Sequence, residues 1–457
     1  MGSRTDPARG ELSDAAVPER LSPWAKGLDA FSRLIGSPGE VSHTSSYLML
    51  STVGSSVLGL AFWAVAAHLF SARAVGAASA EVSTMGLLAG FAQLNFANAY
   101  VRYLPVAELE SGRAIRRGYA VALVTAIVAA VIFFFTPLWR TVVGSDWVAD
   151  AVFFCAVPLW TVFILQDGVL TGLSRAAVVP IENIGFGAAK LALLPLTGLI
   201  ASGNAVFLAW TLPVVPAVGL VSAFLVRNGT RRDAQARARR AGASALPAGR
   251  ELWSFLSAEC VHSLVTSAAT FLLPVIIEVR AGAVTEAHFY VPWLIYLGFN
   301  YLFSNVSSGL VVAMSREGRA SRPPKQALVL MASIATLGLV FTVLIPGPLL
   351  SVLSAAYAVG GAGVLRLVGL SLPFGALSAL FISYLWIEQR IWSLVAARIA
   401  QSAVLIGVTA LFLGDLGLRA AGFGIIGESA VLAVAGAPML WRRRHALSGA
   451  SVQIDQK

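Results

Sequence analysis

The chain has 457 residues, of which 57% are hydrophobic and 12% are charged, and its formal net charge is +10. Soluble domains are about 45–50% apolar and about 25% charged, so this composition nearly excludes a soluble globular protein. The mean hydropathy of +0.77 instead favours a chain built from membrane-spanning helices. The two cysteines, Cys155 and Cys260, both lie in apolar stretches and indicate neither a disulfide nor a zinc site.

The first 45 residues are polar and carry acidic as well as basic side chains. No short apolar run follows a basic start, so we do not expect a cleavable signal peptide. An apolar stripe at helical spacing follows Pro23 and consists of Trp24, Leu28, Phe31 and Ile35. This stripe predicts an interfacial helix on the cytoplasmic leaflet, with a disordered tail as the alternative.

Twelve apolar segments follow, each close to the roughly 20 residues that a bilayer core requires. The first six predicted spans are 46–70, 77–104, 117–137, 148–170, 177–200 and 204–226. The other six are 252–277, 287–312, 326–349, 363–386, 391–413 and 418–440. We expect the second span to be the least hydrophobic and the most easily miscounted. The pattern predicts an all-α, polytopic membrane protein with two groups of six helices.

An arginine-rich stretch separates the two groups of spans. The predicted parts are a cytoplasmic tail (1–45), an N-terminal lobe (46–226), a basic linker (227–251), a C-terminal lobe (252–440) and a second cytoplasmic tail (441–457). The linker either contacts anionic lipid headgroups or acts only as a topology determinant. Phe96 and Asn98 recur as Phe303 and Asn305, which favours a repeated six-helix unit.

The basic residues predict the orientation of the chain in the membrane. With the N-terminus inside, 25 of the 33 Lys and Arg residues fall on inner segments. The outer loops hold only Arg73, Arg140, Arg280 and Arg419. Because cytoplasmic loops collect basic residues, both termini are predicted to lie in the cytoplasm, with the chain in the bacterial cytoplasmic membrane. The net charge then reflects topology rather than nucleic-acid binding.

Three predicted spans carry stripes of polar side chains. The second span contributes Gln93, Asn95, Asn98 and Arg102, the seventh Glu259, His262, Ser263, Thr266 and Thr270, and the eighth Asn300, Tyr301, Asn305 and Ser308. Polar side chains inside a membrane usually face the bundle interior or a hydrated cavity. Since these stripes fall at a similar depth, we predict a cavity that opens to the cytoplasm. The alternative is that they only join helices.

Two of these stripes suggest specific chemistry. The guanidinium of Arg102 can hold a phosphate group through two parallel hydrogen bonds, although a residue near a helix end can also extend to the lipid headgroups. Glu259 and His262, one turn apart, can take up a proton and couple its movement to a conformational change.

Four further charges fall within predicted spans. They are Lys190 near the middle of the fifth span, Arg366 in the tenth, Arg398 in the eleventh and Glu428 near the middle of the twelfth. Such a charge must be paired or hydrated, and Glu428 is a candidate partner for one of the cations. A functional site and a buried structural ion pair explain these charges equally well.

The sequence does not favour an enzyme. The outer loops are short, and their acidic residues are predicted to be unclustered: Asp146, Asp150, Glu278, Glu286 and Asp415. No nucleotide-binding P-loop and no clustered set of metal ligands is present in the sequence.

One stretch resembles a known family. Residues 69–108 read LFSARAVGAASAEVSTMGLLAGFAQLNFANAYVRYLPVAE and are similar to the first-to-second helix region of bacterial polysaccharide and oligosaccharide-lipid flippases. Gly76 matches the loop glycine of that family, and 101–105 (VRYLP) matches the end of its second helix. Residues 355–370 (AAYAVGGAGVLRLVGL) are similar to a Tyr-Ala motif followed by a Leu-Arg run.

The resemblance covers 41–445 and implies the multidrug/oligosaccharidyl-lipid/polysaccharide exporter fold, in which two six-helix lobes form a V around a cationic cavity. It implies transport of an isoprenoid-pyrophosphate-linked glycan from the inner to the outer leaflet. The first span departs from the family pattern, because it offers Ser51, Ser55 and Ser56 but no charge.

We therefore predict a flippase that works by alternating access in cell-surface polysaccharide biosynthesis. Arg102 contacts phosphate in this hypothesis, and Glu259 and His262 couple an ion gradient or the membrane potential, with no other cofactor. The predicted sugar contacts are Gln93, Asn95, Asn98, Asn300, Asn305 and Ser55. The expected partners are membrane lipids and the glycosyltransferases or polymerase of such a pathway. Two alternatives are an ion-coupled drug antiporter of this or the major-facilitator fold, and a non-transporting scaffold.

Overall fold

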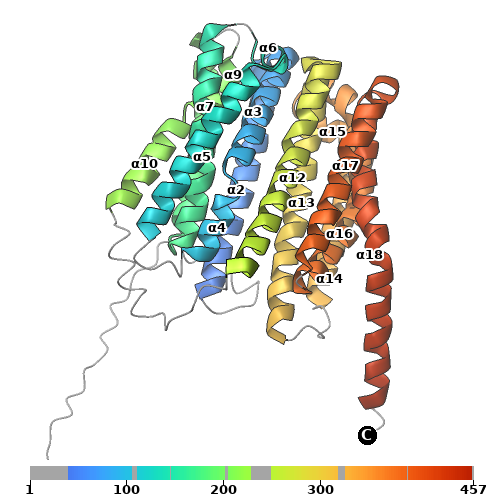
Figure 1. Ribbon diagram of the computed structural model, residues 1–457. Coiled ribbons are helices and arrows are strands. Elements are labelled where there is room, and N and C mark those ends of the chain that lie inside the picture. Colours follow the sequence, from blue (N-terminus) through green and yellow to red (C-terminus); the bar gives the residue numbers. More distant parts are fainter. Residues whose placement is uncertain are drawn as a thin grey trace, which may run out of the picture. The chain divides into compact units, whose positions relative to one another are not determined.

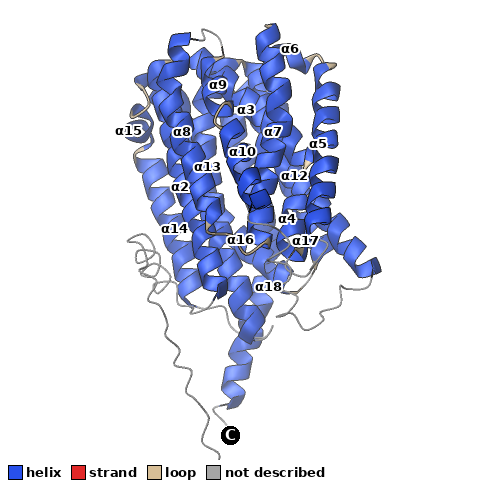
Figure 2. Cartoon of the chain, turned by 90° about the vertical axis from the view of Figure 1, so that its left-hand side faces the viewer, coloured by secondary structure: helices blue, strands red, loops and turns tan. Residues whose placement is uncertain are grey.

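The computed structural model describes residues 40–104, 111–144, 146–200, 204–227, 249–317, 325–388 and 390–454. Figure 2, coloured by secondary structure, shows helices joined by loops throughout this part of the chain, without strands. Residues Tyr47–Lys457 form one compact unit, and all packing discussed below lies within it. The interfacial helix predicted after Pro23 and residues 228–248 of the predicted linker lie outside the described residues.

The helices of the N-terminal half run from blue to green in Figure 1, and those of the C-terminal half from yellow to red. The first set is α2 (Glu40–Leu69), α3 (Ala72–Ala92), α4 (Phe96–Tyr103), α5 (Ser111–Phe134), α6 (Leu138–Val142), α7 (Trp147–Gly172), α8 (Val178–Ile200), α9 (Ala205–Thr211) and α10 (Val214–Arg227). The second set is α12 (Gly249–Ala281), α13 (Ala283–Glu317), α14 (Lys325–Leu344), α15 (Pro346–Ser351), α16 (Ala355–Ile387), α17 (Ile391–Leu416) and α18 (Arg419–Ile454).

Eleven helical stretches among the described residues are long and apolar enough to cross a membrane. The twelfth predicted span corresponds to α13, which has 35 residues but does not belong to these eleven. Its middle carries Asn300 and Asn305 together with several tyrosine and tryptophan residues, which lower its hydropathy. The expectation that the second span would be the one miscounted was therefore wrong, whereas the all-helical polytopic fold is confirmed.

The second predicted span, 77–104, is not one continuous helix. It is divided into α3 and α4 at Leu94 and Asn95, whose φ angles are 47° and 61°. Asparagine tolerates this left-handed region better than most residues, whereas leucine adopts it only under constraint. The constraint is tertiary, because a Cβ at Gly168 or Gly172 of α7 would overlap backbone atoms of α4. The break therefore lets α4 lie directly on α7.

The sixth predicted span is also interrupted, between α9 and α10. Pro213 lies at the interruption and has no N–H to donate to the preceding turn. The two pieces still form one apolar stretch, Ala205–Val226, that is long enough to cross a bilayer.

One helix in each half contacts most of its neighbours, and α3 connects the halves. In the N-terminal half α7 packs against α3, α4, α5 and α10, and in the C-terminal half α16 packs against α13, α14 and α18. Across the two halves, α3 packs against both α12 and α13. Small residues make this contact close, since Gly86 lies against Phe271 and Gly90 against Ser267. A cavity lies beside this contact.

Candidate functional site

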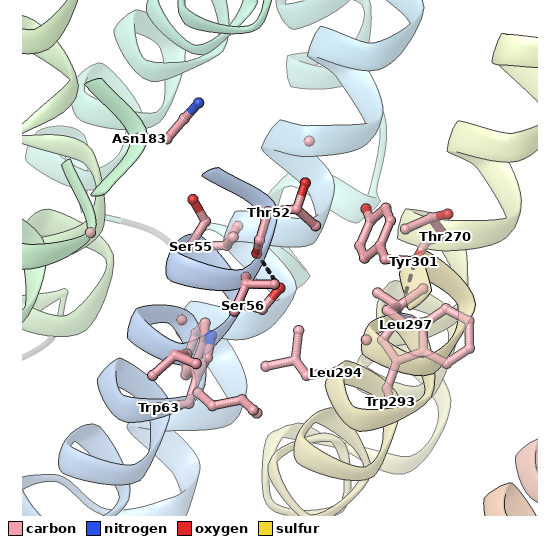
Figure 3. A pocket seen from close by; sticks show the side chains of 18 of the residues that line it. Thr52, Ser55, Ser56, Trp63, Asn183, Thr270, Trp293, Leu294, Leu297 and Tyr301 are labelled. Atoms are coloured by element: carbon pink, nitrogen blue, oxygen red, sulfur yellow. Dashed lines mark hydrogen bonds between the residues drawn. The ribbon is translucent and has the colours of Figure 1, made fainter. Parts of the chain in front are cut away.

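The main cavity of about 660 Å³ lies between the two halves and is lined by both. Figure 3 shows Ser55, Ser56 and Trp63 of α2 on one side, facing Leu294, Leu297 and Tyr301 of α13 on the other. Aromatic side chains dominate the wall, and they include Trp63, Trp160, Phe163, Phe186, Trp210, Phe271, Tyr290, Trp293, Phe299 and Tyr301. A mostly apolar wall with a few polar groups is typical of a binding site for an amphipathic molecule.

The cavity is closed at one end by an aromatic contact between the halves. The rings of Trp63 in α2 and Tyr290 in α13 meet edge to face with centroids 4.8 Å apart, and both side chains are buried. Away from this contact the exposed fraction of the side chains increases, to 60% at Val57 in α2 and 51% at Tyr301 in α13. The cavity is therefore open on the side of Val57 and Tyr301.

A proline and a tryptophan shape the wall on the C-terminal side. Pro274 of α12 has no N–H, so the carbonyl of Thr270, one turn earlier, lacks its usual helical donor. The indole Nε1 of Trp293 in α13 donates to that carbonyl at 3.2 Å (Figure 3). This bond satisfies a freed backbone group inside the bundle and fixes Trp293 at the cavity wall.

Lys190 of α8 brings a positive charge to the cavity. Its side chain is only 4% exposed and lies among three aromatic rings. The Nζ atom is 3.2 Å from the ring centroid of Trp210, 5.1 Å from that of Phe186 and 5.3 Å from that of Phe62. No carboxylate among the described residues forms an ion pair with it within 4.0 Å. The ring faces attract the ammonium group but leave its net charge uncompensated.

Two further polar residues of the N-terminal half line the same cavity. Asn183 of α8 donates to both carboxylate oxygens of Asp167 in α7, at 3.1 Å each. Asn183 and Lys190 are seven residues apart and therefore lie on the same face of α8. The cavity thus combines one acid, one amide and one cation from adjacent helices. Of these three residues only Lys190 was predicted from the sequence, although Asp167 stands out as an acid in an apolar run.

A second, more polar pocket of about 470 Å³ lies within the C-terminal half. The hydroxyl of Tyr296 donates to the carboxylate of Glu428, and Gln401 Nε2 donates to the backbone oxygen of Glu428 at 3.3 Å. Arg398 Nη1 donates to Gln401 Oε1 at 3.0 Å, while the Nε of Arg398 is buried without a hydrogen-bond partner. Within the described residues Glu428 and Arg398 are thus connected through Gln401 rather than by a direct ion pair.

The structure distributes the predicted site residues over three places. Ser55, Asn305 and Lys190 line the main cavity, and His262, Asn300, Arg398 and Glu428 line the second pocket. Gln93, Asn95 and Asn98 lie at the break between α3 and α4, where Asn98 Nδ2 donates to Asn95 Oδ1 at 2.8 Å. Arg366 is exposed on α16. The side chains of Arg102 and Glu259 lie outside the described part of the structure.

Two acids assigned to outer loops belong instead to helices. Glu278 lies in α12 and Glu286 in α13, and both are buried. Glu278 lies within electrostatic range of Glu286 and of Glu81 in α3. The prediction that these acids are unclustered was wrong, since α13 begins at Ala283 and brings Glu286 back into the bundle. Glu81 is missing from the predicted site residues, although an acid within the second predicted span is itself a signal of a special environment.

Comparison with known proteins gives matches at the level of structure. No protein-family model and no curated protein sequence matches the chain. The inward-facing conformation of a multidrug resistance MATE family transporter of the MOP superfamily aligns over 92% of this chain and 98% of its own, with a TM-score of 0.59 and 17% identity. Its outward-facing conformation aligns over the same shares of both chains, with a TM-score of 0.57 and 15% identity.

A eukaryotic MATE transporter, AtDTX14, aligns over 87% of this chain and 94% of its own, with a TM-score of 0.55 and 14% identity. The chain has the MATE transporter fold. This confirms the predicted all-helical exporter fold. At 14–17% identity the likeness concerns the MATE fold alone, so the resemblance to polysaccharide flippases stays a prediction.

Proposed function

We propose that the protein is a membrane transporter that works by alternating access and moves an amphipathic anion, of the isoprenoid-phosphate-linked glycan class, across the cytoplasmic membrane. The observation that carries this proposal is the uncompensated ammonium of Lys190 in an aromatic cavity between the two halves. An anionic phosphate lowers the cost of that buried charge, and apolar walls accept an isoprenoid chain.

Several features of the cavity fit the two ends of such a substrate. Thr52, Ser55 and Ser56 of α2 and Asn305 of α13 offer hydroxyl and amide groups to sugars. The exposed apolar residues Val57 and Leu302 line the open side, where a lipid chain can remain in the bilayer. Arg102 stays a proposed second phosphate contact, and Glu259 with His262 a proposed ion-coupling pair.

The distribution of basic residues sets the direction of loading in this proposal. With both termini in the cytoplasm, α2 runs outward and α13 runs inward. The closed end at Trp63 and Tyr290 then faces the outside, and the open side faces the inner leaflet. Substrate would enter from the cytoplasmic leaflet and leave outward once the contact at Trp63 and Tyr290 separates.

A second candidate is antiport of an amphipathic organic cation. Asp167 lines the cavity together with many aromatic rings, and acids and ring faces both attract cations. The similar structures include that of a multidrug resistance MATE family transporter. In this case Asp167 would contact the substrate, and Lys190 would serve only as a buried structural cation.

A vesicle assay decides between these functions. Purified protein is placed in liposomes with an isoprenoid-phosphate-linked oligosaccharide that carries a fluorophore. A membrane-impermeant quencher added outside quenches only the fluorophore in the outer leaflet, so the fluorescence that remains reports how much lipid is still in the inner leaflet. Lys190→Gln should slow flipping about tenfold or more, because a hydrogen bond to a charged group contributes about 1.5–3 kcal/mol. Lys190→Arg should retain part of the rate, since it keeps the charge.

Lys325→Gln is the matched control, because Lys325 is an exposed lysine at the start of α14. Unchanged flipping by Lys190→Gln would contradict the phosphate role of this residue. Uptake of a fluorescent organic cation that is lost in Asp167→Asn would favour the antiporter. Absence of both activities in folded protein would favour the scaffold.

A further inference from the structure

A fully buried acid lies where the two halves of the chain meet. Glu286 of α13 is 0% exposed, and its Oε2 atom accepts a hydrogen bond from the hydroxyl of Ser79 in α3. Its Oε1 atom is buried without a hydrogen-bond partner. Close beside it, a Cβ on Gly76 would overlap the backbone carbonyl of Ala283. The backbones of α3 and α13 are therefore in direct contact here, and this contact keeps water away from Glu286.

The nearest charged groups do not neutralise this acid. Glu81 of α3 is 4% exposed, and Glu278 of α12 is 8% exposed. Glu278 lies within electrostatic range of Glu81, Glu286 and Arg73. Among the described residues none of the three carboxyl groups forms an ion pair within 4.0 Å. Three buried acids, one from the N-terminal half and two from the C-terminal half, thus lie within electrostatic range of one another through Glu278.

The other side chains around Glu286 are polar but carry no fixed charge. Tyr357 of α16 is 2% exposed, its hydroxyl has no hydrogen-bond partner, and it lies within electrostatic range of Glu286. Tyr290 is buried and also lies within electrostatic range of Glu286. The ring of His288 packs edge-on against Tyr357 with centroids 5.3 Å apart, and its Nε2 is buried without a partner.

The ligand that suits this arrangement is a proton rather than a metal ion. No group of three or more His, Cys, Asp or Glu side chains in the described part of the chain is placed to hold a metal. A buried carboxylate that has no cation and only one hydroxyl donor is costly, and a proton removes its charge.

We propose that Glu286 is a proton-binding site that holds the two halves together at this end while it is protonated and lets them separate when it ionises. This inference rests on the proposed alternating access. Because the proton binds the contacting state more tightly, lower pH favours contact and higher pH favours separation. One proton changes the ratio of the two states by at most about tenfold per pH unit.

The test measures the distance between the halves at this end as a function of pH. Spin labels are attached at Trp147→Cys, at the start of α7, and at Val359→Cys, near the start of α16. Both positions are exposed, at 78% and 86%. The background is Cys155→Ala with Cys260→Ala, since these are the only two cysteines of the sequence. Distances are recorded by pulsed electron resonance in lipid nanodiscs between pH 5 and pH 9, roughly the range where buried acids titrate.

The parent protein should shift from a short to a long distance as the pH rises. Glu286→Gln keeps the shape and an acceptor for Ser79 but cannot ionise, so it should hold the short distance at every pH. Glu278→Gln removes a like charge and eases ionisation of Glu286, which should move the midpoint about one pH unit toward acid. Asp415→Asn, an exposed acid at the end of α17, is the matched control and should behave as the parent.

Failure of this inference is separable from failure of the proposed function. A pH-independent distance in the parent, or an unchanged pH response in Glu286→Gln, would overturn the proton site even if flipping is measured. If Glu286→Gln does not fold, an unmoved midpoint in Glu278→Gln overturns it. A pH-dependent distance that Glu286→Gln abolishes supports the site even when the vesicles flip no lipid.

Discussion

Glu428 shows how a single acid is accommodated inside the C-terminal half. It is buried in α18, and the hydroxyl of Tyr296 in α13 donates to its carboxylate. Arg398 does not reach it directly, because Gln401 lies between the two and bonds to both residues. The stability of this pocket therefore depends on neutral hydrogen-bonding groups as much as on charge.

Removal of the Tyr296 hydroxyl tests this dependence. Tyr296→Phe leaves a buried carboxylate oxygen without its donor, which should lower the free energy of unfolding by about 1–3 kcal/mol. Tyr301→Phe is the matched control on the same helix, because Tyr301 is 51% exposed. Unfolding is measured by denaturant titration in mixed micelles. Equal stability of the two variants would mean that water replaces the Tyr296 hydroxyl.

Residue spacing predicted which side chains share a helix face but not which cavity each face meets. Asn300 and Asn305 both belong to the predicted polar stripe on α13, yet Asn300 lines the pocket of the C-terminal half and Asn305 the main cavity. Lys190 could be found from the sequence because a charge in an apolar span is conspicuous. The aromatic surroundings of Lys190 could not be predicted from the sequence, because Phe62, Phe186 and Trp210 come from three different helices.

At the scale of helices, the break between α3 and α4 is set by packing rather than by local sequence. No proline or glycine marks Leu94 and Asn95, so the apolar pattern predicts one continuous span. The interruption at Pro213 carries its own local signal, because proline cannot continue the hydrogen-bond ladder. Eleven of the twelve predicted spans therefore correspond to described helical stretches that are long and apolar enough to cross a membrane, whereas a break imposed by a neighbouring helix could not be predicted.

Glycines of α7 provide a test of this packing. A Cβ at Gly168 would overlap backbone atoms of Ala97 in α4, so Gly168→Ala should lower the free energy of unfolding by about 1–3 kcal/mol. The matched change is Gly185→Ala in α8, where a Cβ meets open space. That variant should be neutral or stabilised by up to about 1 kcal/mol through helix propensity. Denaturant unfolding of both proteins measures the difference, and loss of stability in Gly185→Ala alone would contradict the role of Gly168.

At the scale of the whole transmembrane unit, the halves share an aromatic cavity to which the N-terminal half contributes its polar residues, and the C-terminal half has a polar pocket of its own. Asp167, Asn183 and Lys190 belong to the N-terminal half, and Arg398, Gln401 and Glu428 to the C-terminal half. The contact between the halves runs along α3, where glycines allow close approach to α12 and α13. Both proposals require this contact to separate and re-form without unfolding either half.

Both proposals also depend on which side of the membrane holds the closed end, and the orientation can be tested directly. We expect Asp415→Cys to react with a membrane-impermeant maleimide in intact cells, and Lys325→Cys to react only after permeabilisation. Asp415 lies at the end of α17 and Lys325 at the start of α14, and both are exposed. The physical reason is that 25 of the 33 basic residues fall on the segments assigned to the cytoplasm.

The labelling is carried out in the cysteine-free background, so that any reaction reports the introduced residue. The reverse pattern would place the contact at Trp63 and Tyr290 on the cytoplasmic side. The cavity would then open toward the outer leaflet in this conformation, and Glu286 would respond to cytoplasmic rather than external pH. Loading from the inner leaflet would in that case require a second conformation, in which α3 has separated from α13 beside Glu286.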